Sequence, residues 1–273
     1  MTDHLDNIRT SYDTVATAYA DLVQDGADWE SEGFDLFAEL AGGRPVLDVG
    51  CGPGTITVDI AGRVAPGPVV GLDASASVIE LARSSAAAHD LPNLSFAVGD
   101  AYALDAGDAS FDVVHAHQVL QHLADPVAAL AEWRRVVRPG GVVAARDADY
   151  AAMTWWPEHP LLDRWMTLYQ WAARANGGEP DAGRRLLAWA RAAGFVEVHP
   201  SASVWCFATP EDRAWWGSLW ADRITTSALA VQIVDAGRAT RHELDEISEA
   251  WRQWATDGDG WFAVPHGEIV AIA

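Results

Sequence analysis

The chain has 273 residues, 50% of them hydrophobic, which is enough to bury one substantial core. Its 39 acidic residues outweigh 18 basic ones, and the formal net charge of −21 argues against a nucleic acid or an anionic membrane as partner. No stretch resembles a signal peptide, no apolar run approaches roughly 20 residues, and the two cysteines, Cys51 and Cys206, indicate no structural disulfide. We therefore expect a cytoplasmic protein.

The chain begins with two predicted helices. Apolar residues recur at helical spacing over residues 4–22, and residues 34–40 predict a second helix that leads into the first strand.

A strand, a glycine-rich loop and a helix follow one another after Pro45. Val46–Val49 predicts a short buried strand, Gly50-Cys51-Gly52-Pro53-Gly54 a tight loop, and residues 55–64 a helix. This order is typical of a nucleotide-type ligand site at the carboxyl edge of a sheet, where glycine lets the ligand approach the backbone. The glycine pattern of dinucleotide-binding sites would have its third glycine at position 55. This chain has Thr55 there, which argues against a nicotinamide site.

Acidic residues end three successive predicted strands. Asp48 ends the first strand and suits a cationic group such as an α-amino group. Asp73 follows the apolar run 69–72, where it can take a pair of ribose hydroxyls. Asp100 follows residues 94–98 and can accept from an adenine amino group or simply cap a turn. Together the three acids describe a ligand with an amine, a ribose and a base.

Strands and helices alternate from Arg44 onward, which predicts a parallel, doubly wound sheet. The expected strands are 46–49, 69–72, 94–98, 111–116 and 141–145, the expected helices are 55–64, 75–88 and 126–137, and Ser75 is the expected N-cap of the second helix. A helix at 184–193 precedes the expected strand 195–208, and residues 260–273 predict the last strand.

Two segments fall outside this alternation. Residues 150–180 form one, and residues 209–258 form the other, with helices expected near 210–223, 225–236 and 240–255. Twelve of the 14 tryptophans lie between Trp155 and Trp261. We expect most of them to bury these segments against the core and a few to line a pocket for a flat or apolar molecule. The chain is interpreted as one domain with a substrate cap.

Five segments carry a family resemblance. VLDVGCGPGT, VVGLDAS, VGDA, FDVVHAHQVLQHLADP and VVRPGGVV resemble the successive motifs of class I S-adenosylmethionine-dependent methyltransferases, in the small-molecule branch similar to the ubiquinone and menaquinone biosynthesis enzymes. The resemblance covers roughly residues 10 to 150. It implies an α/β fold: a Rossmann-like, doubly wound, seven-stranded and mostly parallel sheet, with an antiparallel last strand between the fifth and sixth and a helical substrate cap. The implied parts are an N-terminal helical lid (1–43), a cofactor-binding core (44–149), two cap insertions (150–180 and 209–258) and the last two strands (195–208 and 260–273).

The resemblance implies S-adenosylmethionine as cofactor and methyl transfer to a small organic acceptor. Such an in-line displacement depends mainly on alignment and exclusion of water. Asp48 would hold the amino group of the cofactor, Asp73 its ribose and Asp100 its adenine. The other residues expected at the cofactor are Tyr19, Gly50, Cys51, Gly52, Gly54, Ala74, Ala101, His117 and Gln118.

His122 is the candidate catalytic residue, because an imidazole can take a proton near neutral pH, although a structural hydrogen bond is an equal alternative. His115 alternates with His117 and is expected to pack on the other face. We expect no metal. Asp147 and Asp149 could hold one in principle, but the acid needed after the fourth strand is absent, since His117 and Gln118 stand there.

Three other functions stay open at this point. A nicotinamide oxidoreductase is disfavoured by Thr55, by Asp48 and by the expected antiparallel strand. The same cofactor site could serve non-methylating chemistry such as cyclisation. A non-enzymatic binding protein would leave the glycine loop and its acids without a role. The acceptor atom is undecided between oxygen, nitrogen and carbon, and a homodimer is compatible with the sequence.

Overall fold

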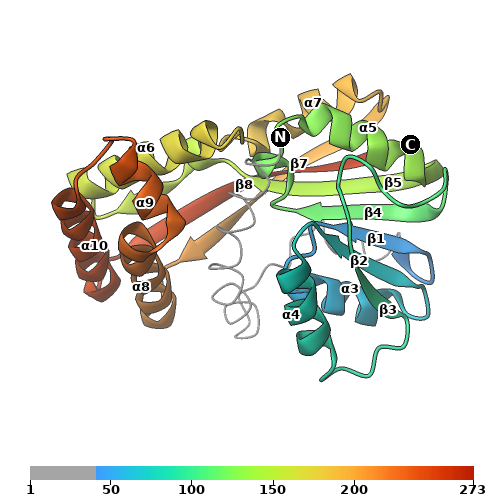
Figure 1. Ribbon diagram of the computed structural model, residues 1–273, viewed down its shortest axis with the longest axis horizontal. Helices are drawn as coiled ribbons and strands as arrows, with labels where there is room; N and C mark the ends of the chain where they lie inside the picture. The colour runs from blue at the N-terminus through green and yellow to red at the C-terminus, as the bar shows by residue number, and fades with distance from the viewer. Residues whose placement is uncertain (1–40) are drawn as a thin grey trace.

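The computed structural model describes residues 41–273 and is organised around an eight-stranded sheet of order β3-β2-β1-β4-β5-β8-β6, with β7 paired to β8 (Figure 1). The predicted helices at 4–22 and 34–40, the lid and Tyr19 lie outside the described residues. The strands are β1 (Val46–Val49), β2 (Val69–Asp73), β3 (Leu94–Val98), β4 (Phe111–His117), β5 (Val137–Ala148), β6 (Thr154–Trp156), β7 (Glu197–Phe207) and β8 (Trp261–Ile272).

Strand direction follows the expected pattern. The pairs among β1 to β5 are parallel, whereas β8 runs antiparallel to β5 and to β7 and lies between them. The antiparallel position predicted for the last strand is therefore confirmed.

The predicted number of seven strands was one too few. The additional strand, β6, has three residues and pairs with Trp261–Ala263 of β8, beyond the part of β8 that pairs with β5. A three-residue strand is too short to show the alternation of apolar and polar residues that predicts a strand, so it can be identified only from its pairing with β8. Strand β5 is also longer than predicted, because β4 supports it on one side and β8 on the other as far as Ala148.

Helices cover both faces of the parallel part of the sheet. They are α3 (Thr55–Val64), α4 (Ala76–Ala86), α5 (Pro126–Val136) and α7 (Leu186–Ala192), close to their predicted ranges. Ser75 is the N-cap of α4, as expected, and its hydroxyl oxygen accepts from the Val78 N–H at 3.4 Å.

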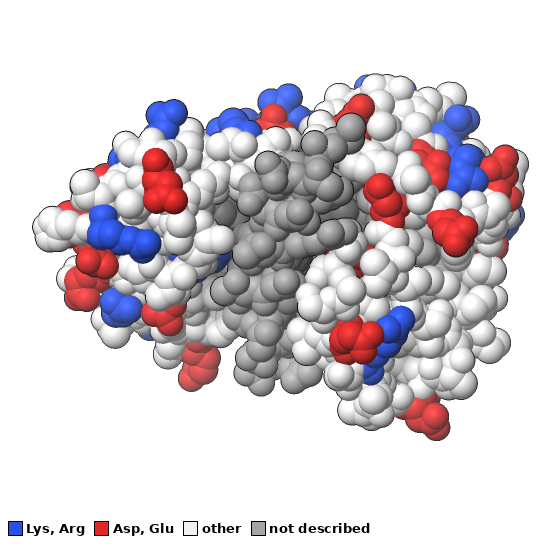
Figure 2. Space-filling model, viewed as in Figure 1, with Lys and Arg blue, Asp and Glu red and all other residues white. Residues whose placement is uncertain are grey.

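A second group of helices gathers at the other end of the long strands β7 and β8 (Figure 1). It contains α8 (Pro210–Thr226), α9 (Ala228–Asp235) and α10 (Arg241–Thr256), as predicted, and also α6 (Pro160–Ala175), which was not predicted. We call α6, α8, α9 and α10 the cap helices. On the face shown in Figure 2, acidic and arginine side chains lie beside one another over these helices and over the rest of the molecule. Among the described helices, none combines the length and hydropathy required to cross a bilayer.

Tryptophans form the core of the cap helices. Trp165 and Trp251 are fully buried, with ring centroids 4.9 Å apart in an edge-to-face arrangement. Trp220 meets Trp165 in the same way at 4.6 Å, and Phe262 of β8 joins the cluster from the sheet. These contacts confirm that most tryptophans attach the cap helices to the sheet, since edge-to-face aromatic pairs add to the burial of apolar area.

Candidate active site

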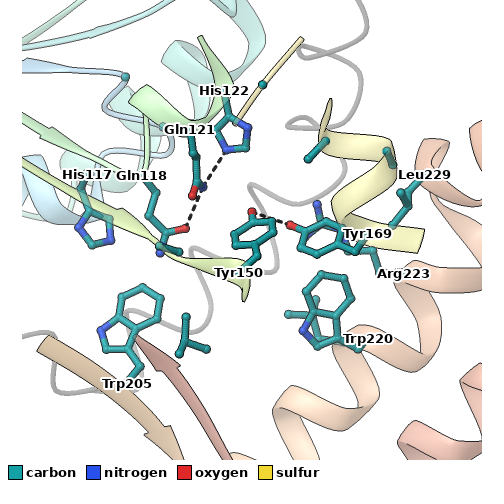
Figure 3. A pocket seen from close by; sticks show the side chains of 18 of the residues that line it. His117, Gln118, Gln121, His122, Tyr150, Tyr169, Trp205, Trp220, Arg223 and Leu229 are labelled. Carbon is teal, nitrogen blue, oxygen red and sulfur yellow. Dashed lines mark hydrogen bonds between the residues drawn. The ribbon is translucent and has the colours of Figure 1, made fainter. Parts of the chain in front are cut away.

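The candidate site lies where the sheet order reverses. Strand β1 has β2 on one side and β4 on the other, so the connections leave it in opposite directions and open a crevice at the carboxyl ends of the strands. A cavity of about 350 Å³ begins there and extends to the cap helices (Figure 3). Its described lining joins the glycine loop, the end of β4, the end of β5 with the turn that follows it, and helices α6, α8 and α9.

The three loop glycines are required for different reasons. All have a positive φ, which is +69° at Gly50, +55° at Gly52 and +83° at Gly54. A β-carbon on Gly50 would lie 2.5 Å from Val119, and one on Gly54 would lie 2.9 Å from Phe96, so packing excludes side chains at both positions. A β-carbon on Gly52 would meet nothing within 4 Å, and Gly52 lines the cavity. Gly52 is therefore where the loop backbone stays open to a ligand.

Asp48 is a buried carboxylate that lines the cavity. The Thr57 hydroxyl donates to it at 2.6 Å, and Nδ1 of His115 lies 2.8 Å from its other oxygen. The expectation that His115 packs on the other face was wrong, because residues two apart on a strand face the same side, so His115 shares a face with His117. The neighbouring strands β1 and β4 then bring His115 opposite Asp48 in the parallel register. Asp48 is thus held in place from two sides.

Asp73 connects the glycine loop to the end of β2. Its two oxygens accept from the N–H of Gly52 at 3.1 Å and from the N–H of Ser75 at 2.9 Å. Burial raises the pKa of the Asp73 carboxyl, and these backbone hydrogen bonds oppose that rise.

Asp100 is exposed and accepts from the N–H of Tyr102 at 2.9 Å, so it does cap a turn. Ala74 and Ala101 are half-buried and follow Asp73 and Asp100 at the ends of neighbouring strands. None of these four residues is among those that line the cavity, and neither is Gly54. They lie along the same sheet edge, beside the glycine loop.

Cys51 lines the cavity as a buried thiol and is not disulfide-bonded. Burial, and then the carboxylates of Asp48 and Asp73, raise its pKa well above the usual value. The thiolate form is therefore absent near neutral pH, and Cys51 is suited to contact rather than to nucleophilic chemistry.

A line of polar side chains crosses the middle of the cavity. Gln121 Nε2 donates to Gln118 Oε1 at 3.4 Å and lies 3.1 Å from His122 Nε2 (Figure 3). His266, which does not line the cavity, places its Nε2 3.2 Å from Gln118 Nε2. Gln118 has a φ of +54°, a conformation that costs a non-glycine residue about 1 to 3 kcal/mol. Such strain is typical of functional positions, and here it turns the Gln118 side chain into the cavity.

Three buried histidines in or beside this line of side chains are held in the neutral form. Burial, and then the positive charge of Arg223, lowers the pKa of His122 to about 4. Burial and Arg146 lower the pKa of His266 to about 2, and the same two causes lower that of His117 well below its usual value. At neutral pH the three imidazoles are therefore uncharged, and each has one ring nitrogen able to accept a hydrogen bond.

Aromatic side chains line the far end of the cavity. Tyr150 and Tyr169 stack with centroids 4.7 Å apart, and their hydroxyls are 2.9 Å from each other (Figure 3). Helix α8 presents Trp216, Trp220 and Arg223 to the same space, at the three- and four-residue spacing of one helix face. The expectation that a few tryptophans line a pocket is confirmed: Trp205, Trp215, Trp216 and Trp220 do so.

The acids after β5 are engaged within the protein. Asp149 forms a two-bond ion pair with Arg184 at 2.5 and 2.6 Å, and Arg146 pairs with Glu268 at 3.1 Å. Asp147 is fully buried and accepts from the N–H of Gln121 at 2.9 Å, and burial raises its pKa to about 7. Within residues 41–273, no group of histidine, cysteine and acidic side chains is arranged to hold a metal ion.

Tertiary structure thus brings Asp48, Gly50, Cys51, Gly52, His117, Gln118 and His122 together around one cavity. Sequence reasoning missed other residues of the cavity, among them Gln121, Tyr169 and Arg223. Arg223 could have been found, because it continues the helix face of Trp216 and Trp220. His266, which contacts Gln118 without lining the cavity, could not have been found, because its position depends on the pairing of β8 with β5.

Comparisons with known proteins agree with this geometry. The model of the family described as "Methyltransferase domain" matches residues 40–194. An uncharacterized methyltransferase of Schizosaccharomyces pombe is 40% identical over 82% of this chain and 83% of its own length. A trans-aconitate 2-methyltransferase of Methylobacterium radiotolerans is 38% identical over 52% of this chain and 50% of its own. Phosphoethanolamine N-methyltransferase 2 of Haemonchus contortus, solved with S-adenosylhomocysteine, shares the fold with a TM-score of 0.55 at 17% identity, over 88% of this chain and 52% of its own.

Proposed function

The chain belongs to the class I S-adenosylmethionine-dependent methyltransferase family, and from this premise we propose that it methylates a small organic acceptor bound between the sheet edge and the cap helices. Membership excludes the nicotinamide oxidoreductase considered above and makes S-adenosylmethionine the cofactor. One observation carries the assignment of the acceptor site: the glycine loop and the cap helices line the same continuous cavity.

The residues at the sheet edge fit this cofactor. The open backbone at Gly52 gives room for close approach of the ligand, and the Asp48 carboxylate, in the cavity wall beside it, suits an α-amino group. Asp73 holds the N–H of Gly52 and lies where the family resemblance puts the ribose. We assign the adenine to the neighbourhood of Ala74, Asp100 and Ala101, along the ends of β2 and β3, and Gly50, Cys51, Gly54, His117, Gln118 and Tyr19 to the remaining contacts. When bound, the cofactor supplies an electrophilic methyl group.

The polar line in the middle of the cavity is assigned to the acceptor. His122 is held neutral and can accept the proton that a hydroxyl or amino acceptor loses. Its low pKa makes it a weak base, so its role is to receive a proton during transfer and not to ionise the acceptor beforehand. Gln121 Nε2 donates to His122 Nε2, so the methyl acceptor must replace Gln121 as the donor to this nitrogen before its proton is transferred there. The walls of aromatic rings exclude water from the path of the methyl group.

Calorimetry and product analysis test the proposal. We expect the protein to bind S-adenosylhomocysteine, and Asp73→Asn to weaken that binding by about tenfold or more, since one charge-assisted acceptor is lost. Asp105→Asn, on an exposed surface position, is the matched control and should bind as the wild type does. Unchanged affinity in Asp73→Asn would contradict the ribose assignment.

The reaction is tested separately by mass spectrometry of candidate acceptors incubated with S-adenosylmethionine. A product heavier by one methyl group supports methyl transfer. A rearranged product of unchanged mass would indicate the non-methylating chemistry considered above.

A further inference from the structure

Arg223 is the unusual residue of the cavity. Among the described lining residues, Asp48 and Arg223 are the two that carry a formal charge at neutral pH. Asp48 lies at the glycine loop and is engaged by Thr57 and His115. Arg223 is on α8 among the cap helices, so the acceptor end of the cavity is positive although the whole chain has a net charge of −21.

The charge of Arg223 is held in position without being neutralised. Its guanidinium carbon lies 4.9 Å from the ring centroid of Trp220 and 5.5 Å from that of Tyr169. Aromatic faces attract a cation through their quadrupoles but carry no net charge to cancel it. Arg146 is different, because it lies 4.7 Å from the Trp205 centroid and also pairs with Glu268.

No carboxylate of the described residues compensates Arg223. Its Nε is buried and has no hydrogen-bond partner among residues 41–273, and no ion pair involves Arg223 there. Its positive charge also reaches His122, where it lowers the pKa of the imidazole. Burying part of a guanidinium whose N–H groups have no acceptor costs free energy, unless an anion accepts hydrogen bonds from them.

The surroundings of Arg223 select the shape of that anion. Stacked or edge-on rings from Tyr150, Tyr169, Trp216 and Trp220 bound the space next to the guanidinium. The amides of Asn176 and Gln232, which also line the cavity, bond to each other at 2.7 and 3.3 Å and are uncharged, so they leave Arg223 as the cation of this wall. One planar cation with aromatic walls suits a flat carboxylate, because the guanidinium fork matches the two oxygens. A phosphate would call for more cations or backbone donors than this wall offers.

We propose that the methyl acceptor is a planar organic carboxylate whose carboxylate group is bound by Arg223, with its flat body between the aromatic rings of the cap helices. This inference rests on the proposed function and specifies its substrate class. The carboxylate then fixes the orientation of the acceptor, and the reacting atom lies toward Gln118 and His122.

Matched pairs of probes test the proposal with S-adenosylhomocysteine bound. Benzoate, cinnamate and naphthoate are each compared by calorimetry with the corresponding neutral amide, using the full chain. We expect the wild type to favour at least one carboxylate over its amide by about tenfold, since a charge-assisted bidentate contact is lost in the amide. Arg223→Gln should abolish that preference, and Arg223→Lys should retain part of it.

Arg238→Gln provides the matched control. Arg238 also lies on an aromatic ring, 4.9 Å from the Trp171 centroid, but it is exposed and does not line the cavity. Its substitution should leave the preference unchanged, and the melting temperature of each variant checks that the cap helices stay folded.

The contrary outcomes are distinct. If no carboxylate binds better than its amide, or if the preference survives in Arg223→Gln, the proposal is wrong. If phenyl phosphate bound more tightly than benzoate, and this binding depended on Arg223, the proposed carboxylate would be wrong and the acceptor would be a phosphate ester. Failure of S-adenosylhomocysteine itself to bind would instead contradict the proposed function.

Discussion

The two ends of the cavity are built in different ways. At the sheet edge, short side chains and backbone N–H groups fix Asp48 and Asp73 through hydrogen bonds. At the cap helices, large aromatic rings pack around the fully buried Trp165 and Trp251. The cofactor end is therefore defined by local loop geometry, and the acceptor end by the packing of residues that are distant in the sequence.

This difference separates two kinds of mutational effect. Substitutions at the glycine loop should change ligand affinity more than stability, because few apolar contacts are lost there. Substitutions in the aromatic cluster should change stability first, because each ring supports several others.

The largest effect is expected for Trp165→Ala. Removing a fully buried indole should lower the free energy of unfolding by about 3 to 5 kcal/mol, measured by urea denaturation. Trp156→Ala is the control, since that side chain is 56% exposed and its removal should cost well under 1 kcal/mol. Equal losses in the two variants would show that the cluster does not support the cap helices.

Gly52→Val tests the other end. A side chain here projects into the cavity and should weaken S-adenosylhomocysteine binding by about 100-fold in calorimetry, or roughly 2.7 kcal/mol. Gly140→Val bears a comparable backbone cost, with φ +76° and open space around its β-carbon, but lies away from the cavity. If both variants bound the cofactor product equally well, Gly52 would not be a ligand contact.

Asp147 is a buried carboxyl that accepts from the N–H of Gln121, and its ionisation should make the free energy of unfolding depend on pH. Its pKa is about 7 in the folded protein against roughly 3.9 when unfolded, so its stabilising contribution is complete below pH 4 and is lost as pH rises through 7. Asp147→Asn should therefore gain stability relative to wild type between pH 5 and pH 8, by about 1 to 4 kcal/mol. Urea denaturation at the two pH values measures the difference, and a constant difference would contradict the buried charge.

His122→Ala should have the smallest effect. We expect about a tenfold lower kcat with an unchanged affinity for S-adenosylhomocysteine, because the side chain is assigned to the acceptor and not to the cofactor. In the wild type the pKa of His122 is about 4, so the imidazole stays neutral at pH 6. A profile of kcat against pH should therefore show no loss of activity between pH 7 and pH 6. Unaltered turnover in the variant would leave His122 a structural role only.

Sequence reasoning predicted the cofactor half well because its signals are local. The loop from Gly50 to Gly54, the N-cap Ser75 and the alternation of strands and helices each depend on neighbours within a few residues. The same locality explains the errors. β6 exists only through its pairing with β8, and His115 meets Asp48 only because β1 and β4 are adjacent.

The sequence by itself determined the family, the parallel core and the glycine loop, since backbone conformation and motif spacing are properties of contiguous segments. Only the tertiary structure decided the end at the cap helices, where α6 and α8 bring Tyr169 and Arg223 to the wall of one cavity. Burial and proximity create the chemistry there: they hold His122 neutral and place the Arg223 cation against aromatic rings, and neither effect can be read from a residue and its chain neighbours.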